Sequence, residues 1–244
     1  MSSVDRDVPF ASADSNHRKS AALNIPKPLI LDSIFYRVPE LKILDGAYLE
    51  VQPGKITALI GLNGSGKSTL MKIVSGQLKA SSGISIINGE RLYSKSLKKR
   101  FCSIAYLPQD SMLPRDMKVK RLIRSFPSAG FLMDDPFFKR LLRQKVLELS
   151  GGERRYLEVS LLFSLDRDFI LLDEPFSGVE PKIVERMLTR IKIEVNKNRG
   201  VLLTDHLHRY VTDVADTGYL LHNRQCYRLE GDISSELKKL GYIR

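Results

Sequence analysis

The sequence predicts an α/β protein of the P-loop NTPase type, built around a mostly parallel central sheet. Three observations support this fold class. The apolar segment 56–60 leads into a glycine-rich loop and then into a helix-like segment. Further along the chain, apolar segments alternate with helix-like ones, as in parallel α/β sheets. Two of the apolar segments, Phe169–Leu172 and Val201–Leu203, are continuous, which is typical of strands buried on both faces.

The N-terminal part of the chain divides into a tail and a β-rich segment. Residues 1–27 are polar and show no hydrophobic period, so we predict a disordered tail there and a folded domain over residues 28–244. The domain is expected to begin with an antiparallel β-subdomain, in which Asn88-Gly89 forms a hairpin-type turn. The strands expected in this part span residues 29–38, 47–51 and 83–87.

The central elements follow in chain order. A strand over 55–61 precedes the glycine-rich loop, and a helix over 68–76 follows it. After a strand over 103–107 the chain becomes basic and helix-like, so we predict a short inserted helical subdomain at about 110–165. Its helical pieces are expected at 117–126, 136–142 and 151–165. The remaining elements are expected as strands at 169–172, 201–203, 219–221 and 225–229 and as helices at 181–195 and 233–240.

The glycine-rich loop matches the P-loop pattern Gly-x-x-x-x-Gly-Lys-Ser, which wraps the phosphates of a nucleoside triphosphate. Glycines let successive N–H groups face a phosphate, and the following helix directs its positive end at the same anion. Lys67 is expected to reach the β- and γ-phosphates, and Ser68 to ligate Mg²⁺. The alternative is a flexible glycine loop. The residues predicted to bind the nucleotide here are Gly61, Leu62, Asn63, Gly64, Ser65, Gly66, Lys67, Ser68 and Thr69.

Polar residues follow three of the predicted parallel strands, at the edge where such sheets bind ligands. Asp173 is predicted to ligate Mg²⁺ together with Ser68, and Glu174 to act as the general base for the attacking water. The alternative interpretation of Asp173 is an acid that caps a helix or lies in a turn, and that of Glu174 is an ordinary surface acid before Pro175. His206 is predicted to contact the γ-phosphate rather than to be structural. The same argument is applied to Gln109, but its place at the end of a strand is the only evidence for it.

A second helix start resembles an anion site. Ser150-Gly151-Gly152-Glu153 fits the capping-box pattern, and this alone would make it a well-capped helix. Glycines at a helix entrance also leave N–H groups free for an anion, so Ser150, Gly151 and Gly152 are predicted to bind nucleotide. Two phosphate-binding helix ends in one chain serve one nucleotide if two chains meet head to tail.

Composition narrows the functional classes. The net charge is +11, and residues 91–145 hold 14 Lys and Arg against 4 Asp and Glu. Such a segment can face anionic lipid, nucleic acid or an acidic partner, or can be a solvated surface. No apolar run approaches the roughly 18 residues of a membrane span. Cys102 and Cys226 are expected to be ordinary thiols of a cytosolic protein.

Taken together, the motifs resemble those of the ATPase subunit of an ATP-binding cassette (ABC) transporter across roughly residues 29–230. Residues 61–69 match the Walker A motif, Gln109 the Q-loop, 149–153 the signature, 169–174 Walker B, and His206 the switch histidine. Tyr36 is similar in placement to the aromatic residue that stacks on adenine, although it could equally be a strand aromatic in the core. Within the family, the motifs resemble lipopolysaccharide-export and branched-chain amino acid ATPases.

The resemblance implies a mechanism and partners. Two chains, expected to be a homodimer, enclose two ATP molecules, with Mg²⁺ held by Ser68, Gln109 and Asp173. Glu174, His206 and Gln109 act in hydrolysis, which drives a separate transmembrane permease. The protein would then be peripheral on the cytoplasmic face of the inner membrane, where its basic segment meets anionic lipid.

Two features depart from the family pattern: Glu180 stands where an Asp is usual, and the segment from Gln109 to the signature is short. That segment usually forms the groove for the permease, so a reduced groove suggests a dedicated partner. The alternative function is a soluble cassette ATPase in cofactor assembly or acting on nucleic acid. The lack of a long coiled-coil insertion and of a second cassette in this sequence argues against a nucleic-acid partner.

Overall fold

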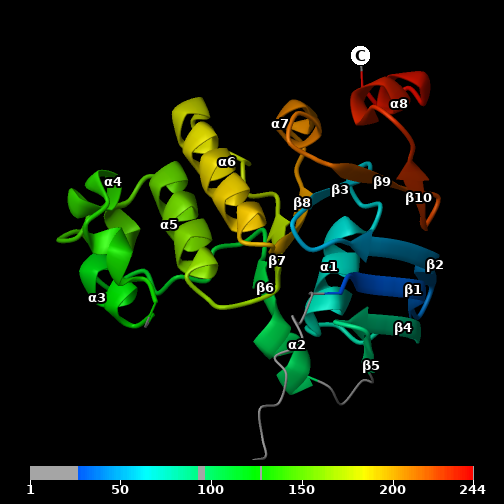
Figure 1. Cartoon of the computed structure of the whole chain (residues 1–244), viewed down its shortest axis with the longest axis horizontal. Coiled ribbons are helices and arrows are strands. Elements are labelled where there is room, and N and C mark those ends of the chain that lie inside the picture. Colours follow the sequence, from blue (N-terminus) through cyan, green and yellow to red (C-terminus); the bar gives the residue numbers. More distant parts are fainter. Residues whose placement is uncertain (1–26, 93–96, 127, 244) are drawn as a thin grey trace, which may run out of the picture.

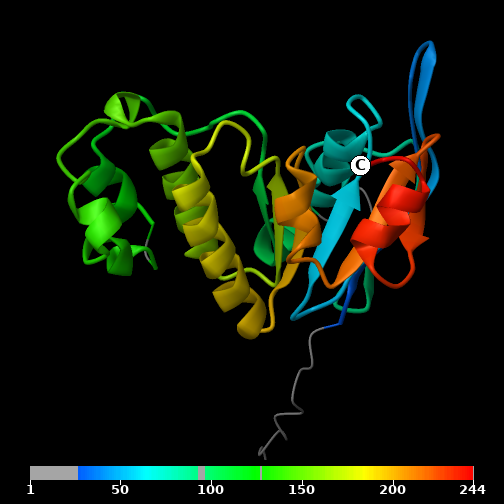
Figure 2. The ribbon, with the colours of Figure 1, turned by 90° about the horizontal axis from the view of Figure 1, so that it is seen from above.

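The computed structural model describes residues 27–92, 97–126 and 128–243 (Figure 1). The predicted disordered tail therefore lies almost wholly outside the described residues. The chain forms two sheets with helices packed around them. Figure 2 shows α3 (Val119–Arg124) and α4 (Pro136–Lys139) at one end of the molecule and the hairpin of β1 (Leu29–Val38) and β2 (Leu41–Val51) at the other. Helices α5 (Gly151–Phe163) and α6 (Pro181–Asn196) lie between the α3–α4 end and the central sheet.

The central sheet has six strands in the order β10-β9-β3-β8-β7-β6. All its neighbours are parallel except β10, which pairs antiparallel with β9. The predicted mostly parallel sheet is thus confirmed, and β3, β8, β7 and β6 end side by side at one edge. The strands are β3 (Ile56–Ile60), β6 (Ile104–Leu107), β7 (Phe169–Asp173), β8 (Gly200–Thr204), β9 (Thr217–His222) and β10 (Gln225–Leu229).

The second sheet is antiparallel, in the order β2-β1-β4-β5, as expected for the N-terminal β-subdomain. The expected strand over 47–51 is confirmed as the end of β2, but the strand is longer than expected: β2 begins at Leu41, where it pairs with Val38 directly after the turn. The hairpin at Asn88-Gly89 is confirmed by the pairing of β4 with β5. The strands are β1 (Leu29–Val38), β2 (Leu41–Val51), β4 (Ser82–Ile87) and β5 (Glu90–Leu92).

The inserted helical region is less helical than expected. The predicted helices over 117–126 and 136–142 are shorter in the structure, as α3 and α4, and one 3₁₀ turn lies between α3 and α4 and another between α4 and α5. Two short helices, α2 and α7, were not predicted, since neither segment has a helical hydrophobic period. The helices are α1 (Lys67–Ser75), α2 (Leu97–Ser103), α3 (Val119–Arg124), α4 (Pro136–Lys139), α5 (Gly151–Phe163), α6 (Pro181–Asn196), α7 (His208–Thr212) and α8 (Ile233–Lys239), with 3₁₀ turns at Gly130–Met133 and Val146–Glu148.

The core lies on both faces of the central sheet. Ile170 and Leu172 of β7 pack into a cluster with α5 and α6, whereas Phe169 and Leu171 pack into a cluster with α1 and the β-subdomain. All four side chains are fully buried. The continuous apolar pattern of this strand therefore serves two cores at once, and it anchors the loop that follows Asp173 at the sheet edge.

Candidate nucleotide-binding site

The P-loop connects β3 to α1, and its main chain takes conformations that favour glycine. Gly64 and Gly66 have φ values of 75° and 109°. A Cβ at Gly66 would lie 3.2 Å from the side chain of Ile43 and 3.3 Å from that of Leu44, so these side chains would have to shift slightly, and the positive φ would strain the loop. The first N–H groups of a helix have no partner within the helix, so those of α1 are available to an anion at the P-loop.

Lys67 lies across the P-loop. Its ammonium donates to the carbonyls of Gly61, at 2.8 Å, and Leu62, at 3.1 Å. Burial lowers the pKa of Lys67, and the nearby carboxylates of Glu174 and Asp173 oppose that shift. The lysine is therefore a partly desolvated cation held at the phosphate position, where it interacts more strongly with an anion than an exposed lysine would.

Asp173 ends β7 with its carboxylate fully buried, and two hydroxyl groups hold it. Ser68 Oγ donates to Oδ1 at 3.1 Å, and Tyr106 Oη donates to Oδ2 at 3.0 Å. Burial and the Asp173 carboxylate raise the pKa of Tyr106 far above its usual value, so the phenol remains a donor. The structure thus brings together two of the three predicted Mg²⁺ ligands, Ser68 and Asp173.

These donors suit Mg²⁺, which takes oxygen ligands and commonly combines one or two protein side chains with substrate phosphates and water. Gln109, the third predicted ligand, donates from Nε2 to Glu174 Oε2. This hydrogen bond does not use the amide oxygen of Gln109, which is the atom that could ligate Mg²⁺. In the described parts of the chain, no group of three or more His, Cys, Asp or Glu residues is arranged to hold a metal alone.

Glu174, which follows β7, contacts the residues that follow two neighbouring strands, β6 and β8. Its Oε1 lies 2.7 Å from His206 Nε2, and its Oε2 accepts from Gln109 Nε2 at 2.9 Å. Glu174 is 7% exposed and has a φ of 48°, an unusual conformation that its N–H stabilises by donating to Thr204 O at 2.8 Å. The residues that follow β6, β7 and β8 thus converge, as predicted for the carboxyl edge of the sheet.

The P-loop and these side chains line one open cavity of about 380 Å³. Its apolar wall comes from β2, through Leu41 and Ile43. Tyr36 instead lines a neighbouring cavity on the β1–β2 hairpin and packs against the core, so the structure does not bring it together with the P-loop. The lining residues are Leu41, Ile43, Asn63, Gly64, Gly66, Lys67, Ser68, Thr69, Gln109, Glu174 and His206.

The second predicted anion site lies at the N-terminus of α5. Ser150 Oγ accepts from the N–H of Glu153 at 3.1 Å, and the Glu153 carboxylate accepts from the N–H of Ser150 at 3.0 Å. The predicted capping box is thus confirmed. Ser150, Gly151 and Gly152 do not line the P-loop cavity, so within one chain the N-termini of α1 and α5 cannot contact the same phosphate.

Sequence reasoning missed three residues that organise this site. Tyr106 holds Asp173, and Asp205 accepts from the N–H groups of Phe176 at 2.7 Å and Leu207 at 3.0 Å, which fixes the loops after β7 and β8. Arg155 contacts the main chain of two of the loops. The position of Asp205 beside His206 is a signal that could have been used, whereas nothing local marks Tyr106 or Arg155.

The geometry agrees with known proteins. Residues 44–177 match the family model described as ABC transporter. An uncharacterized ABC transporter ATP-binding protein of Rhizobium meliloti is 30% identical over 194 residues, which cover 74% of this chain and 72% of that protein. The lipopolysaccharide export system ATP-binding protein LptB of Haemophilus influenzae is also 30% identical, over 74% of this chain and 80% of that protein.

Solved structures show the same fold. One described as the ADP conformation of an ATP-binding cassette of an ABC transporter superposes with a TM-score of 0.76 and 25% identity, over 88% of this chain and 96% of that chain. A nucleotide-free ATP-binding cassette from an ABC transporter superposes with a TM-score of 0.74, over 86% of this chain and 94% of that chain.

The fold and site are those of a P-loop ATPase, and the chain belongs to the ABC transporter ATP-binding family. It is an ATP-binding subunit of an ABC transporter, and it hydrolyses ATP. The comparisons support this function over a cassette ATPase of cofactor assembly or one acting on nucleic acid. In the part of the chain that the structure describes, no helix is both long and apolar enough to cross a membrane.

Proposed function

We propose that two copies of this chain enclose two molecules of MgATP, each between the P-loop of one copy and the α5 N-terminus of the other. The support is the separation of two anion-binding helix ends within one chain. The P-loop cavity is open, and Ser150 and Gly152 lie outside it. A partner that faced this opening with its own α5 would add N–H donors and a helix dipole to the γ-phosphate. Nucleotide binding then closes the dimer, because the γ-phosphate contacts both copies.

The P-loop side chains are assigned to the phosphates and Mg²⁺. Lys67 exchanges its carbonyl contacts for the β- and γ-phosphates, and Ser68 and Asp173 hold Mg²⁺ with the amide oxygen of Gln109. Bound Mg²⁺ would neutralise charge on the phosphates. At the base end, Leu41 and Ile43 line the cavity, so we assign adenine to this apolar wall. A role for Tyr36 would require the β1–β2 hairpin to change its arrangement.

Glu174 is proposed as the general base, and one observation carries this assignment. Its carboxylate lies between Gln109 and His206, on the same cavity as the P-loop lysine. A carboxylate beside the γ-phosphate can accept the proton of the attacking water once one oxygen is free. His206 would release Glu174 and donate to the γ-phosphate, which couples the arrival of nucleotide to the exposure of the base.

A separate transmembrane permease is the proposed partner, and it would hold the protein on the cytoplasmic face of the inner membrane as a peripheral subunit. The basic segment 91–145 is proposed to contribute to this association. Lys98, Lys118 and Lys120 are exposed on α2 and around α3, and Lys99 pairs with Glu90. Anionic headgroups attract each such cation by about 1 kcal/mol near the surface.

The test uses Glu174→Gln, which keeps the size of the side chain and removes its basicity. We expect the rate of phosphate release to fall by about 10²- to 10⁴-fold, the usual contribution of a general base. Light scattering should show this variant as a monomer without nucleotide and as a dimer with MgATP. The matched control is Glu185→Gln, an exposed acid on α6, which should hydrolyse ATP normally. Normal hydrolysis by Glu174→Gln would refute the base assignment, and an unchanged mass at saturating MgATP would refute the dimer.

A further inference from the structure

Arg155, in the second turn of α5, donates hydrogen bonds to main-chain carbonyls at the ends of two strands of the site, β6 and β7. Its Nη1 donates to Pro108 O at 2.8 Å, and its Nη2 donates to Asp173 O at 2.7 Å and Glu174 O at 3.2 Å. The side chain is 9% exposed. A guanidinium presents its donors in a fixed planar fork, so these three carbonyls are held in one geometry relative to α5.

The carbonyls that Arg155 holds belong to the loops that carry Gln109 and Glu174. Pro108 directly precedes Gln109, and Glu174 has the left-handed main chain described above. A left-handed non-glycine residue is unfavourable by about 1–3 kcal/mol and persists only when its surroundings hold it. Here Arg155 holds the carbonyl of Glu174 and Thr204 holds its N–H. Arg155 therefore fixes the main chain from which the side chains of Gln109 and Glu174 extend, and it makes no hydrogen bond to either side chain.

A second pair of contacts keeps Arg155 itself in place. Its Nη1 also donates to Glu158 Oε2 at 3.1 Å, one turn further along α5. Glu158 is 5% exposed, so its charge is balanced mainly by this arginine. Ser111, in the loop after Gln109, donates to the other oxygen of Glu158. The pair thus joins α5, whose N-terminal end carries Ser150 and Gly152, to the loop after β6 and to the end of β7.

We propose that Arg155 is a positioning residue for ATP hydrolysis: it sets Glu174 and Gln109 relative to each other and to the signature end of α5. The proposal rests on the proposed roles of Glu174 and Gln109. This role requires the planar guanidinium group of Arg155, and a positive charge alone is not sufficient. A lysine at this position keeps a cation beside Glu158 but places its three donors at one point, so it cannot hold all three carbonyls in the same plane.

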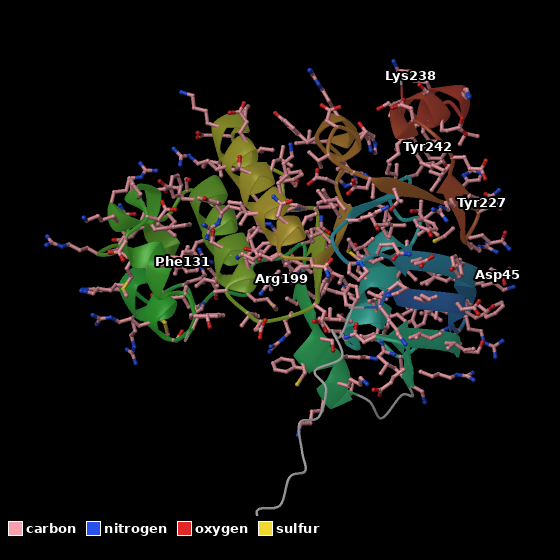
Figure 3. All side chains as sticks on the ribbon, viewed as in Figure 1. Asp45, Phe131, Arg199, Tyr227, Lys238 and Tyr242 are labelled. Carbon is pink, nitrogen blue, oxygen red and sulfur yellow. The ribbon has the colours of Figure 1, made fainter. Side chains whose placement is uncertain are left out.

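The test compares Arg155→Lys with Arg199→Lys. Arg199 is largely buried too, with its side chain 14% exposed, and it donates to Phe163 O at 2.9 Å and pairs with Glu194, at the far end of α5 from the site. Figure 3 labels it. Both substitutions remove a buried fork that holds main chain, so both should lower the unfolding temperature. Only Arg155→Lys should lower kcat, by about ten- to a hundredfold, as displaced catalytic groups do.

The split between kcat and binding separates positioning from general destabilisation. We expect the KM for MgATP and the calorimetric Kd for MgADP to change by no more than about twofold in Arg155→Lys, because the P-loop contacts are intact. A kcat equal to that of Arg199→Lys would overturn the proposal, as would a loss of MgADP binding as large as the loss of kcat. If Arg155→Lys does not fold, Glu158→Gln decides: it should lower kcat in the same direction, and an unchanged kcat would overturn the proposal.

Failure of this inference is distinguishable from failure of the base assignment. Unimpaired hydrolysis by Glu174→Gln would remove the proposed base whatever Arg155 does. An impaired Glu174→Gln beside an unimpaired, folded Arg155→Lys would leave the base in place and remove only the positioning role.

Discussion

Tyr106→Phe removes a single hydroxyl group from beside the proposed Mg²⁺ ligand Asp173. The ring keeps its volume, so no cavity forms, and only the 3.0 Å hydrogen bond to Asp173 Oδ2 is lost. Both residues are buried, Tyr106 at 8% and Asp173 at 1% exposure, so water does not replace the donor. A hydrogen bond to a charged group contributes about 1.5–3 kcal/mol, and Ser68 on the other oxygen is not positioned to compensate.

Two measurements follow from this loss. For a domain of this size, about 2–4 °C per kcal/mol converts the loss into an unfolding temperature about 3–12 °C lower without nucleotide. Residues that orient a metal ligand usually change metal affinity by about 10- to 100-fold. We therefore expect the Mg²⁺ concentration for half-maximal ATP hydrolysis to rise by about tenfold, while kcat at saturating Mg²⁺ stays close to that of the unaltered protein.

Tyr227→Phe is the matched control. The hydroxyl of Tyr227 donates to Gln225 at 3.0 Å on the exposed strand β10 (Figure 3), so its loss should change neither quantity. A Tyr106→Phe protein with reduced stability but an unchanged Mg²⁺ requirement would contradict the placement of Mg²⁺ at Asp173. A protein as stable as the control would contradict the hydrogen bond itself.

Two further predictions concern the surface and the thiols. Reversing the charge of four basic side chains should weaken binding to vesicles that contain anionic lipid without affecting ATP hydrolysis, and equal binding would refute the membrane role of the basic segment; the four are Lys98, Lys99, Lys118 and Lys120. Among the described residues both cysteines are free, Cys102 exposed and Cys226 partly buried. Burial raises the pKa of Cys226 to about 12, so a thiolate-selective reagent at pH 8 should label Cys102 alone, and intact-mass spectrometry showing two labels in the folded protein would contradict this environment.

The elements with a clear hydrophobic period were predictable, and those without one were not. Strand β7 and helix α6 have continuous or periodic apolar patterns, so their positions followed from the chain alone. Helix α2 has a basic sequence and ends one residue before β6, and its formation depends on packing against neighbours. Strand β2 extends to Leu41 because β1 offers it a partner that far, which the composition of 41–46 does not reveal.

Site residues followed the same division. The proximity of Lys67, Ser68, Asp173 and Glu174 was predictable because each lies in a short motif next to a buried strand, and their roles in binding and hydrolysis stay predictions. Tyr36 shows the limit of a resemblance in a variable loop. On an antiparallel hairpin, the pairing register decides which side chains face the P-loop, and here that wall is formed from β2.

The amino-acid sequence by itself determined the class of chemistry, since a glycine-rich loop before a helix binds phosphate through its own main chain. It also determined which residues follow each buried strand. Only the tertiary structure decided which of those residues touch, because the order β3-β8-β7-β6 comes from packing between segments far apart in the chain. The contacts of Glu174 with Gln109 and His206, and of Arg155 with both loops, exist for that reason.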